Sequence, residues 1–146
     1  MMFLSKNLSD TSNLARDFLL KVAKLKNGSQ SLVVGLYGDL GSGKTTFVQF
    51  LARELGIKEN ITSPTFVIEK IYPIQIDFPY KNLIHIDCYR INDPAEMTVL
   101  RWDETLANPD NLIVTEWPER IKNLLPRNRL EIKFKFIDEN TREIEF

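Results

Sequence analysis

One short segment of the chain combines glycines, a lysine and a hydroxyl residue in an order that suits a phosphate ligand. It reads Gly38-Asp39-Leu40-Gly41-Ser42-Gly43-Lys44-Thr45, and Thr46 follows it. The three glycines allow backbone N–H groups to turn inward around a phosphate chain. Lys44 adds a positive charge, and the Thr45 hydroxyl is placed to ligate magnesium. The segment therefore predicts a phosphate-binding loop that takes a nucleoside triphosphate, with residues 38–46 as its contacts.

Two carboxylates are candidates to complete this site. Asp87 closes an apolar stretch that starts at Leu83, and Glu116 closes another that starts at Leu112. A phosphate-binding loop usually needs a carboxylate from a neighbouring strand to hold magnesium through a water, and often another group to orient the attacking water. Asp87 and Glu116 are therefore the predicted acidic residues of the site, and the sequence does not decide which lies nearer the metal.

Several nearby residues have two readings. His85 is the only histidine, and it is either a hydrogen-bonded packing residue or a group that responds to the phosphates. Trp117 is either core or a surface that senses nucleotide or partner, and Arg90 reaches either a phosphate or a carboxylate. Asp39 either hydrogen-bonds within the loop or is solvated. Cys88 lies on the apolar face of its strand, so we expect it in the core.

The elements predicted around the loop are those of an α/β domain. A buried strand at 31–37 precedes the loop, and a helix from Thr45 to Leu55 follows it. Strands at 66–72 and 83–89 have no helix between them and should pair antiparallel. The remaining expected elements are an edge strand at 2–6, an amphipathic helix around 14–25, a helix from 93 to about 107, a strand at 112–116, a short helix from 118 to about 125, and an antiparallel hairpin from 130 to the end. Together they predict a single domain over 1–146, with a central mixed sheet flanked by helices and a C-terminal hairpin.

Composition limits the possible functions. The chain has 146 residues, 43% of them hydrophobic, and a formal net charge of -1. A chain of this charge lacks the basic balance that binds RNA or DNA by phosphate neutralisation alone, so we expect no DNA partner and only indirect contact with RNA. The single cysteine fits a reducing compartment. No apolar signal or membrane-length run is apparent, so the expected location is the cytoplasm, without a membrane partner.

Four stretches together resemble one protein family. They are the loop at 38–46, Thr62-Ser63-Pro64-Thr65-Phe66, His85-Ile86-Asp87-Cys88-Tyr89-Arg90 and Glu116-Trp117-Pro118-Glu119-Arg120. Their order and spacing resemble the TsaE family, formerly called YjeE, which are bacterial ATPases required to make threonylcarbamoyladenosine in tRNA. The resemblance covers nearly the whole chain. The stretch 97–104 is less typical of the family, so the resemblance does not imply that these residues contact a partner protein.

The resemblance implies a division of roles at the site. Lys44 and Thr45 would hold phosphate and magnesium, Thr65 would lie in a switch-like segment, and Asp87 and Glu116 would form the acidic part. The implied cofactors are ATP and Mg²⁺. The implied partners are the TsaB and TsaD proteins, whose complex transfers a threonylcarbamoyl group to the adenosine next to the tRNA anticodon, at position 37. ATP hydrolysis would reset that complex for another turnover.

Other functions of a phosphate-binding loop remain as alternatives. A small-molecule kinase usually needs an arginine-rich lid over the transferred phosphoryl group, and no such segment is apparent. A GTPase would carry a guanine-reading Asn-Lys-x-Asp segment, which is absent from the sequence. A nucleotide-gated binding module with negligible turnover stays open, because the loop alone does not require hydrolysis.

Overall fold

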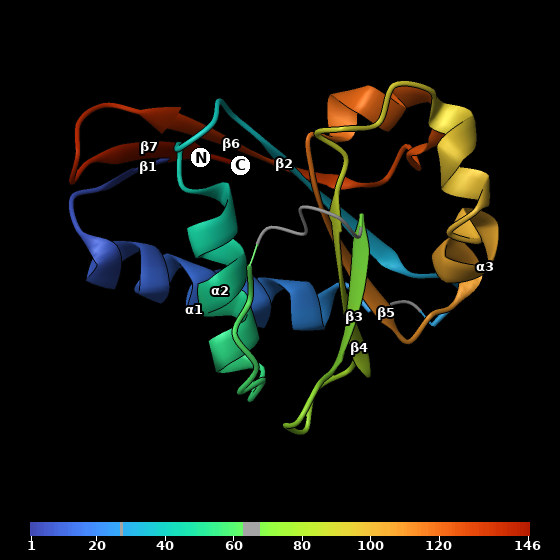
Figure 1. The fold of residues 1–146 in the computed structure, drawn as a ribbon. Coiled ribbons are helices and arrows are strands. Elements are labelled where there is room, and N and C mark those ends of the chain that lie inside the picture. Colours follow the sequence, from blue (N-terminus) through green and yellow to red (C-terminus); the bar gives the residue numbers. More distant parts are fainter. Residues whose placement is uncertain (27, 63–67) are drawn as a thin grey trace.

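Four parallel strands form the middle of the sheet, and antiparallel strands extend it on both edges. The computed structural model describes residues 1–26, 28–62 and 68–146, and the strand order is β1-β7-β6-β2-β5-β4-β3 (Figure 1). The strands are β1 (Met2–Ser5), β2 (Leu32–Tyr37), β3 (Glu69–Pro73), β4 (Asn82–Asp87), β5 (Asn111–Glu116), β6 (Leu130–Phe136) and β7 (Arg142–Glu145). Strands β6, β2, β5 and β4 pair in parallel, while β1 with β7, β7 with β6, and β3 with β4 pair antiparallel. The mixed sheet and the C-terminal hairpin confirm the predicted fold class.

Helices cover both faces of this sheet. They are the α-helices α1 (Leu8–Lys24), α2 (Lys44–Glu54) and α3 (Trp102–Ala107), and the 3-10 helices η1 (Pro94–Thr98) and η2 (Pro118–Leu124). Helices α1 and α2 pack on one face, and η1, α3 and η2 lie on the other (Figure 1). The central strands are therefore buried on both sides, which explains why β2, β4 and β5 read as continuous apolar runs without alternation.

The predicted phosphate-binding loop joins the end of β2 to the start of α2. Gly38 opens the loop with φ at +148°, a conformation that L side chains rarely adopt. A Cβ atom at Gly38 would lie 2.6 Å from both the Phe134 carbonyl oxygen and the Ser42 hydroxyl. Glycine at this position therefore allows the loop to turn tightly against β6.

The predicted helix from 93 to 107 is wrong as one continuous element. It divides into η1 and α3, and Arg101 between them has the left-handed φ of +54°. The side chains of Met97 and Trp102 both belong to the core under this face of the sheet. An unbroken α-helix would separate residues five apart by about 140° around its axis, so the break brings both side chains onto the core.

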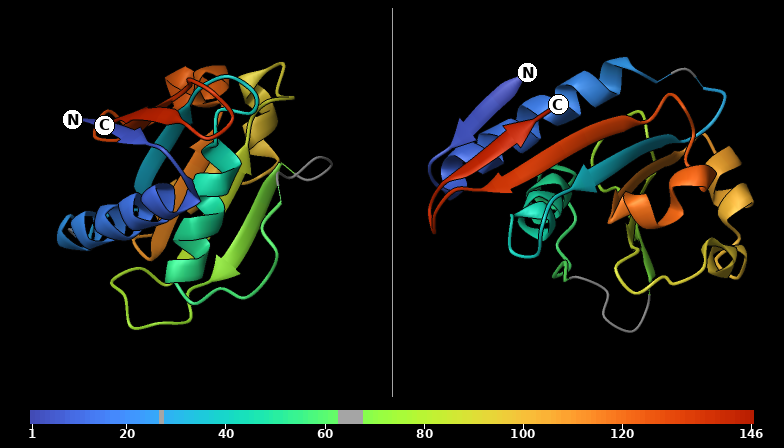
Figure 2. Two further views of the ribbon diagram at one scale, coloured as in Figure 1. Left: turned by 90° about the vertical axis from the view of Figure 1, so that its left-hand side faces the viewer. Right: turned by 90° about the horizontal axis from the view of Figure 1, so that it is seen from above.

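The two ends of the chain lie side by side (Figure 2). Strand β1 pairs with β7, and the Phe146 N–H donates to the Met1 carbonyl oxygen at 3.0 Å. This pairing places β1 and the start of α1 next to the C-terminal hairpin. Within the described part of the chain, no helix has both the length and the apolar character that crossing a membrane requires.

Candidate functional site

A cavity of about 400 Å³ opens over the carboxyl ends of the parallel strands. Its walls come from the loop, from the ends of β4 and β5, and from the hairpin. The lining residues are Leu40, Gly41, Ser42, Gly43, Lys44, Thr45, Thr46, Ile68, Asp87, Tyr89, Arg90, Glu116, Trp117 and Arg142. The structure thus brings the predicted loop and both predicted carboxylates to one site, as expected where parallel strands end at a common edge.

Lys44 lines this cavity together with Arg90 and Arg142, and it is held by the loop itself. Its Nζ donates to the carbonyl oxygen of Gly38 and, at 3.0 Å, to that of Asp39. Burial lowers the pKa of Lys44 from its usual value, and the carboxylates led by Glu116 oppose this shift. The ammonium group therefore lies in a partly desolvated position, where a phosphate would provide the negative charge that stabilises it.

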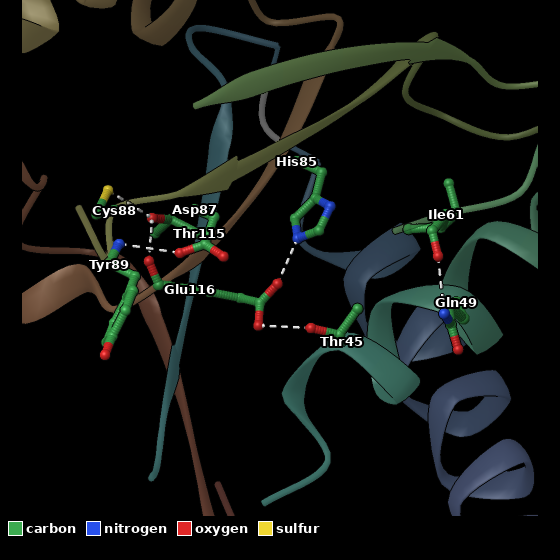
Figure 3. A network of polar contacts seen from close by, with 9 residues as sticks. All are labelled: Thr45, Gln49, Ile61, His85, Asp87, Cys88, Tyr89, Thr115 and Glu116. Atoms are coloured by element: carbon green, nitrogen blue, oxygen red, sulfur yellow. Dashed lines mark hydrogen bonds and ion pairs between the residues drawn. The ribbon is translucent and has the colours of Figure 1, made fainter. Parts of the chain in front are cut away.

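The Glu116 carboxylate links the loop helix to β4. One of its oxygens, Oε1, accepts a hydrogen bond from the Thr45 hydroxyl at 2.9 Å (Figure 3). The other, Oε2, lies 2.6 Å from Nε2 of His85. Glu116 and His85 are both buried, and they come from paired parallel strands. Glu116 is therefore the predicted acidic residue that contacts the magnesium-ligand candidate Thr45.

Asp87 lies beside Glu116 in the register of β4 and β5. Asp87 is buried, and its Oδ1 accepts a hydrogen bond from the Tyr89 backbone N–H at 2.9 Å (Figure 3). This contact turns the chain as it leaves β4, and Asp87 still lines the cavity. The two carboxylates thus share the site but have different immediate partners.

Aromatic rings form one wall of the site. Nζ of Lys44 lies 4.4 Å from the centroid of the Trp117 ring, which is 5.1 Å from that of Tyr89. Trp117 has φ at +56°, and this left-handed turn follows directly after Glu116. The Trp117 ring packs against the core and also contacts the loop lysine, and its role in sensing nucleotide or partner stays a prediction. Arg90 is exposed and lines the same cavity.

The donor set fits a bound phosphate with magnesium. The Ser42 hydroxyl is buried and has no hydrogen-bond partner among the described residues, so it is available to a ligand oxygen. Two cis oxygens of an octahedral magnesium, each at 2.0–2.1 Å, are about 2.9 Å apart. The Thr45 and Glu116 oxygens already have this separation. Thr45 and Glu116 would therefore both reach a magnesium ion without moving apart, with the Thr45 hydroxyl proton turned away from Glu116.

Arg142 lines the site and was not among the residues predicted from the sequence. It starts β7, and its side chain lies next to Gly43, where a Cβ would meet Arg142 Nε at 3.4 Å. The guanidinium donates to carbonyl oxygens of the hairpin turn, among them that of Asp138 at 2.9 Å. No local motif marks this arginine, because its position depends on the hairpin folding back over the loop.

A second cavity of about 440 Å³ adjoins the first on the other side of Arg142. Gly43, Thr46 and Arg142 line both cavities. The remaining walls come from the start of α1 and from the hairpin: Ser5, Asn7, Leu8, Ser9, Thr11, Phe134, Glu139, Asn140 and Ile144. This mixture of polar groups and apolar surface is typical of a small-molecule site.

The remaining predicted residues have varied positions. Gly38 and Asp39 contribute the carbonyl oxygens that bind Lys44. Thr65, predicted as a switch residue, lies outside the described residues. Cys88 is fully buried, which agrees with its predicted place in the core, and burial raises the pKa of its thiol to about 11.

Comparisons with known proteins point to one family. The family described as threonylcarbamoyl adenosine biosynthesis protein TsaE matches residues 5–144. The tRNA threonylcarbamoyladenosine biosynthesis protein TsaE of Rickettsia typhi is 38% identical over 134 residues, which cover 91% of this chain and 85% of the relative. The protein of the same name from Bacillus subtilis is 40% identical over 114 residues, or 78% of this chain and 68% of the relative. The crystal structure of Bacillus subtilis YdiB superposes with a TM-score of 0.72 at 31% identity, covering 99% of this chain and 82% of that one.

Proposed function

Because the chain belongs to the TsaE family of threonylcarbamoyl adenosine biosynthesis proteins, we propose that it is a magnesium-dependent ATPase of that pathway. The reaction is the hydrolysis of ATP to ADP and phosphate. The observation that carries the proposal is the contact between the Thr45 hydroxyl and the Glu116 carboxylate beside Lys44. It brings a hydroxyl oxygen and a carboxylate oxygen together at the mouth of the predicted phosphate-binding loop, and magnesium is bound by oxygen ligands, carboxylates among them.

Each group of the loop has a distinct role in this proposal. The backbone N–H groups of 38–46 and the Ser42 hydroxyl bind phosphate oxygens. Lys44 leaves the carbonyl oxygens of Gly38 and Asp39 and pairs with the phosphates, where it stabilises charge that develops during transfer. Thr45, Glu116 and Asp87 hold the magnesium ion. When bound, that ion neutralises phosphate charge and polarises the bond that breaks.

The acidic residues have a second task in hydrolysis. Phosphoryl transfer to water depends mainly on positioning and electrostatic stabilisation, so an oriented acceptor for the water proton suffices. Glu116 and Asp87 both face the cavity, and one of them orients the attacking water. Thr65 stays a proposed switch residue that closes over the site when nucleotide binds.

The nucleoside part of ATP lies in the second cavity. This cavity continues from the phosphate site past Gly43 and Arg142. Asp87 and Glu116 line the first cavity only, so the second cavity lies away from the carboxylates. The Arg142 guanidinium, placed between the two cavities, pairs with a phosphate or ribose oxygen. Adenine is the expected base, since the sequence lacks the guanine-reading segment of GTPases.

The turnover serves a complex of the TsaB and TsaD partners. In this proposal, ATP hydrolysis resets that complex after it modifies the adenosine at position 37 of the tRNA. A chain with a net charge of -1 is poorly suited to hold tRNA by itself. Contact with tRNA is therefore proposed to pass through the partners.

Phosphate release by the purified chain tests the proposal. Hydrolysis is measured with and without magnesium, alone and with a TsaB–TsaD complex plus tRNA. Lys44→Ala should lower the rate by at least roughly a hundredfold, because a donor to the transferring phosphate is lost, while Lys122→Ala, an exposed lysine outside both cavities, should leave it unchanged. Hydrolysis that survives in the Lys44 variant would contradict the site, and phosphate transferred to an acceptor other than water would identify a kinase instead.

A further inference from the structure

His85 is a fully buried ionisable side chain next to the proposed catalytic carboxylate. It lies on β4, where its backbone pairs with Val114 of β5, two residues before Glu116. Residues two apart on a strand point to the same face, so the imidazole and the Glu116 carboxylate both lie on the face covered by α2. The 2.6 Å contact between Nε2 and Oε2 spans this diagonal (Figure 3).

Nε2 is the ring nitrogen that faces the Glu116 carboxylate. When Glu116 is ionised, its carboxylate only accepts hydrogen bonds, so in that state Nε2 of His85 carries the proton and donates it to Oε2. The other ring nitrogen, Nδ1, is buried and has no hydrogen-bond partner among the described residues. Within the described chain, therefore, the hydrogen bonding of the imidazole is directed at Glu116.

We propose that His85 is a positioning residue that fixes the rotation of the Glu116 carboxylate, so that Oε1 stays turned toward Thr45. The terminal torsion of a glutamate side chain is soft, and hydrogen bonds must select its orientation. Oε1 is held by the Thr45 hydroxyl and Oε2 by His85. This inference rests on the proposed function, in which Thr45 and Glu116 serve the magnesium site.

The two hydrogen bonds of Glu116 should respond differently when magnesium binds at the site. A Thr45 hydroxyl that ligates magnesium directs its oxygen at the ion and no longer has the same partner. His85 lies behind Glu116 and is absent from the cavity lining, so its bond to Oε2 persists. His85 is thus the contact that preserves the carboxylate orientation when the Thr45 contact changes.

Two conservative variants separate positioning from simple core packing. Glutamine can place its amide N–H near the position of Nε2, whereas asparagine is shorter and places its amide near that of Nδ1. Both side chains are polar, uncharged and smaller than the histidine that they replace. His85→Gln should therefore retain the bond to Oε2, and His85→Asn should lose it.

The expected result is a difference in turnover between these two variants. His85→Asn should lower kcat about tenfold to a hundredfold, the usual effect of losing a hydrogen bond to a charged group, while His85→Gln stays within a few-fold of the wild type. The dissociation constant for ATP without magnesium should be the same in all three proteins, because His85 does not line the phosphate cavity. Equal kcat values for the two variants, whether lowered or not, would overturn the proposal.

Two readouts do not depend on hydrolysis. In ¹⁵N spectra of the nucleotide-free wild type, the single imidazole should carry its proton on Nε2, and a bare Nε2 would overturn the proposal. Calorimetric titration of magnesium into each ADP-loaded protein should give weaker binding for His85→Asn than for His85→Gln, and equal affinities would overturn it. A wild type that binds magnesium with ADP but hydrolyses no ATP would contradict the proposed ATPase alone. Thermal unfolding establishes whether each variant is folded. If His85→Asn does not fold, the ¹⁵N measurement still tests the proposal, because it uses only the wild type.

Discussion

Glu116 and Asp87 end neighbouring parallel strands, yet their carboxylates are held in different ways. Glu116 contacts Thr45 and His85, while Asp87 accepts a hydrogen bond from the backbone that follows it. We therefore expect Glu116→Gln to raise the magnesium concentration needed for half-maximal hydrolysis by roughly tenfold or more, because the variant removes a charged ligand candidate next to Thr45. Asp87→Asn should change this concentration less.

Magnesium titrations of the steady-state rate measure the difference between these two matched variants. Both replace a carboxylate by an amide of the same shape, so packing is nearly unchanged. A larger magnesium defect in Asp87→Asn than in Glu116→Gln would reverse the assignment and make Asp87 the nearer group.

Cys88 allows a test of how completely the β4 end is buried. Burial disfavours the thiolate and raises the pKa of the thiol to about 11. At pH 9 a thiol with the ordinary pKa of 9.0 is about half ionised, and one with this raised pKa is about one per cent ionised. Alkylation should therefore be slower by roughly fiftyfold from ionisation alone. Iodoacetamide labelling, followed by mass spectrometry, should thus be slow in the native chain and fast in urea. Equal rates would mean that β4 opens readily in solution.

At the scale of the elements, Arg101 marks the break between η1 and α3. Its left-handed backbone costs an L-residue about 1–2 kcal/mol, and glycine avoids that cost. We expect Arg101→Gly to be more stable than Arg101→Ala by about 1 kcal/mol in urea unfolding. Both variants lose the exposed ion pair with Glu104, so the comparison isolates the backbone. Equal stability would indicate that the break relaxes when the arginine is removed.

Elements defined by local signals were predictable from the sequence. The loop at 38–45 follows a continuous apolar strand and precedes a helix, and both carboxylates close apolar runs, so their common edge followed from the geometry of parallel strands. The interruption at Arg101 was missed, because a left-handed residue other than glycine or asparagine has no clear sequence signal. Arg142 was missed because its place beside Gly43 arises from the hairpin packing over the loop. The roles assigned to the site residues, Thr65 included, stay predictions.

The two adjoining cavities lie between separate parts of the fold. The first cavity is bounded by the loop and the ends of β4 and β5, whereas the second is bounded by the start of α1 and the hairpin. A ligand that occupies both would connect the ends of β4 and β5 with the start of α1 and the hairpin across the loop. A ligand confined to the first would contact the α1 side only through Gly43, Thr46 and Arg142.

This difference predicts how nucleotides stabilise the protein. A ligand that binds only the native state adds about 2.7 kcal/mol at a hundred times its dissociation constant, which for a chain of this size corresponds to roughly 5–10 °C in Tm. At equal concentration with magnesium, ATP should therefore raise Tm more than tripolyphosphate, which lacks the nucleoside. Differential scanning fluorimetry measures both shifts, with Lys44→Ala as the control in which both should shrink. Equal shifts for ATP and tripolyphosphate would exclude the second cavity as the nucleoside site and leave the phosphate-binding loop as the whole of the binding surface.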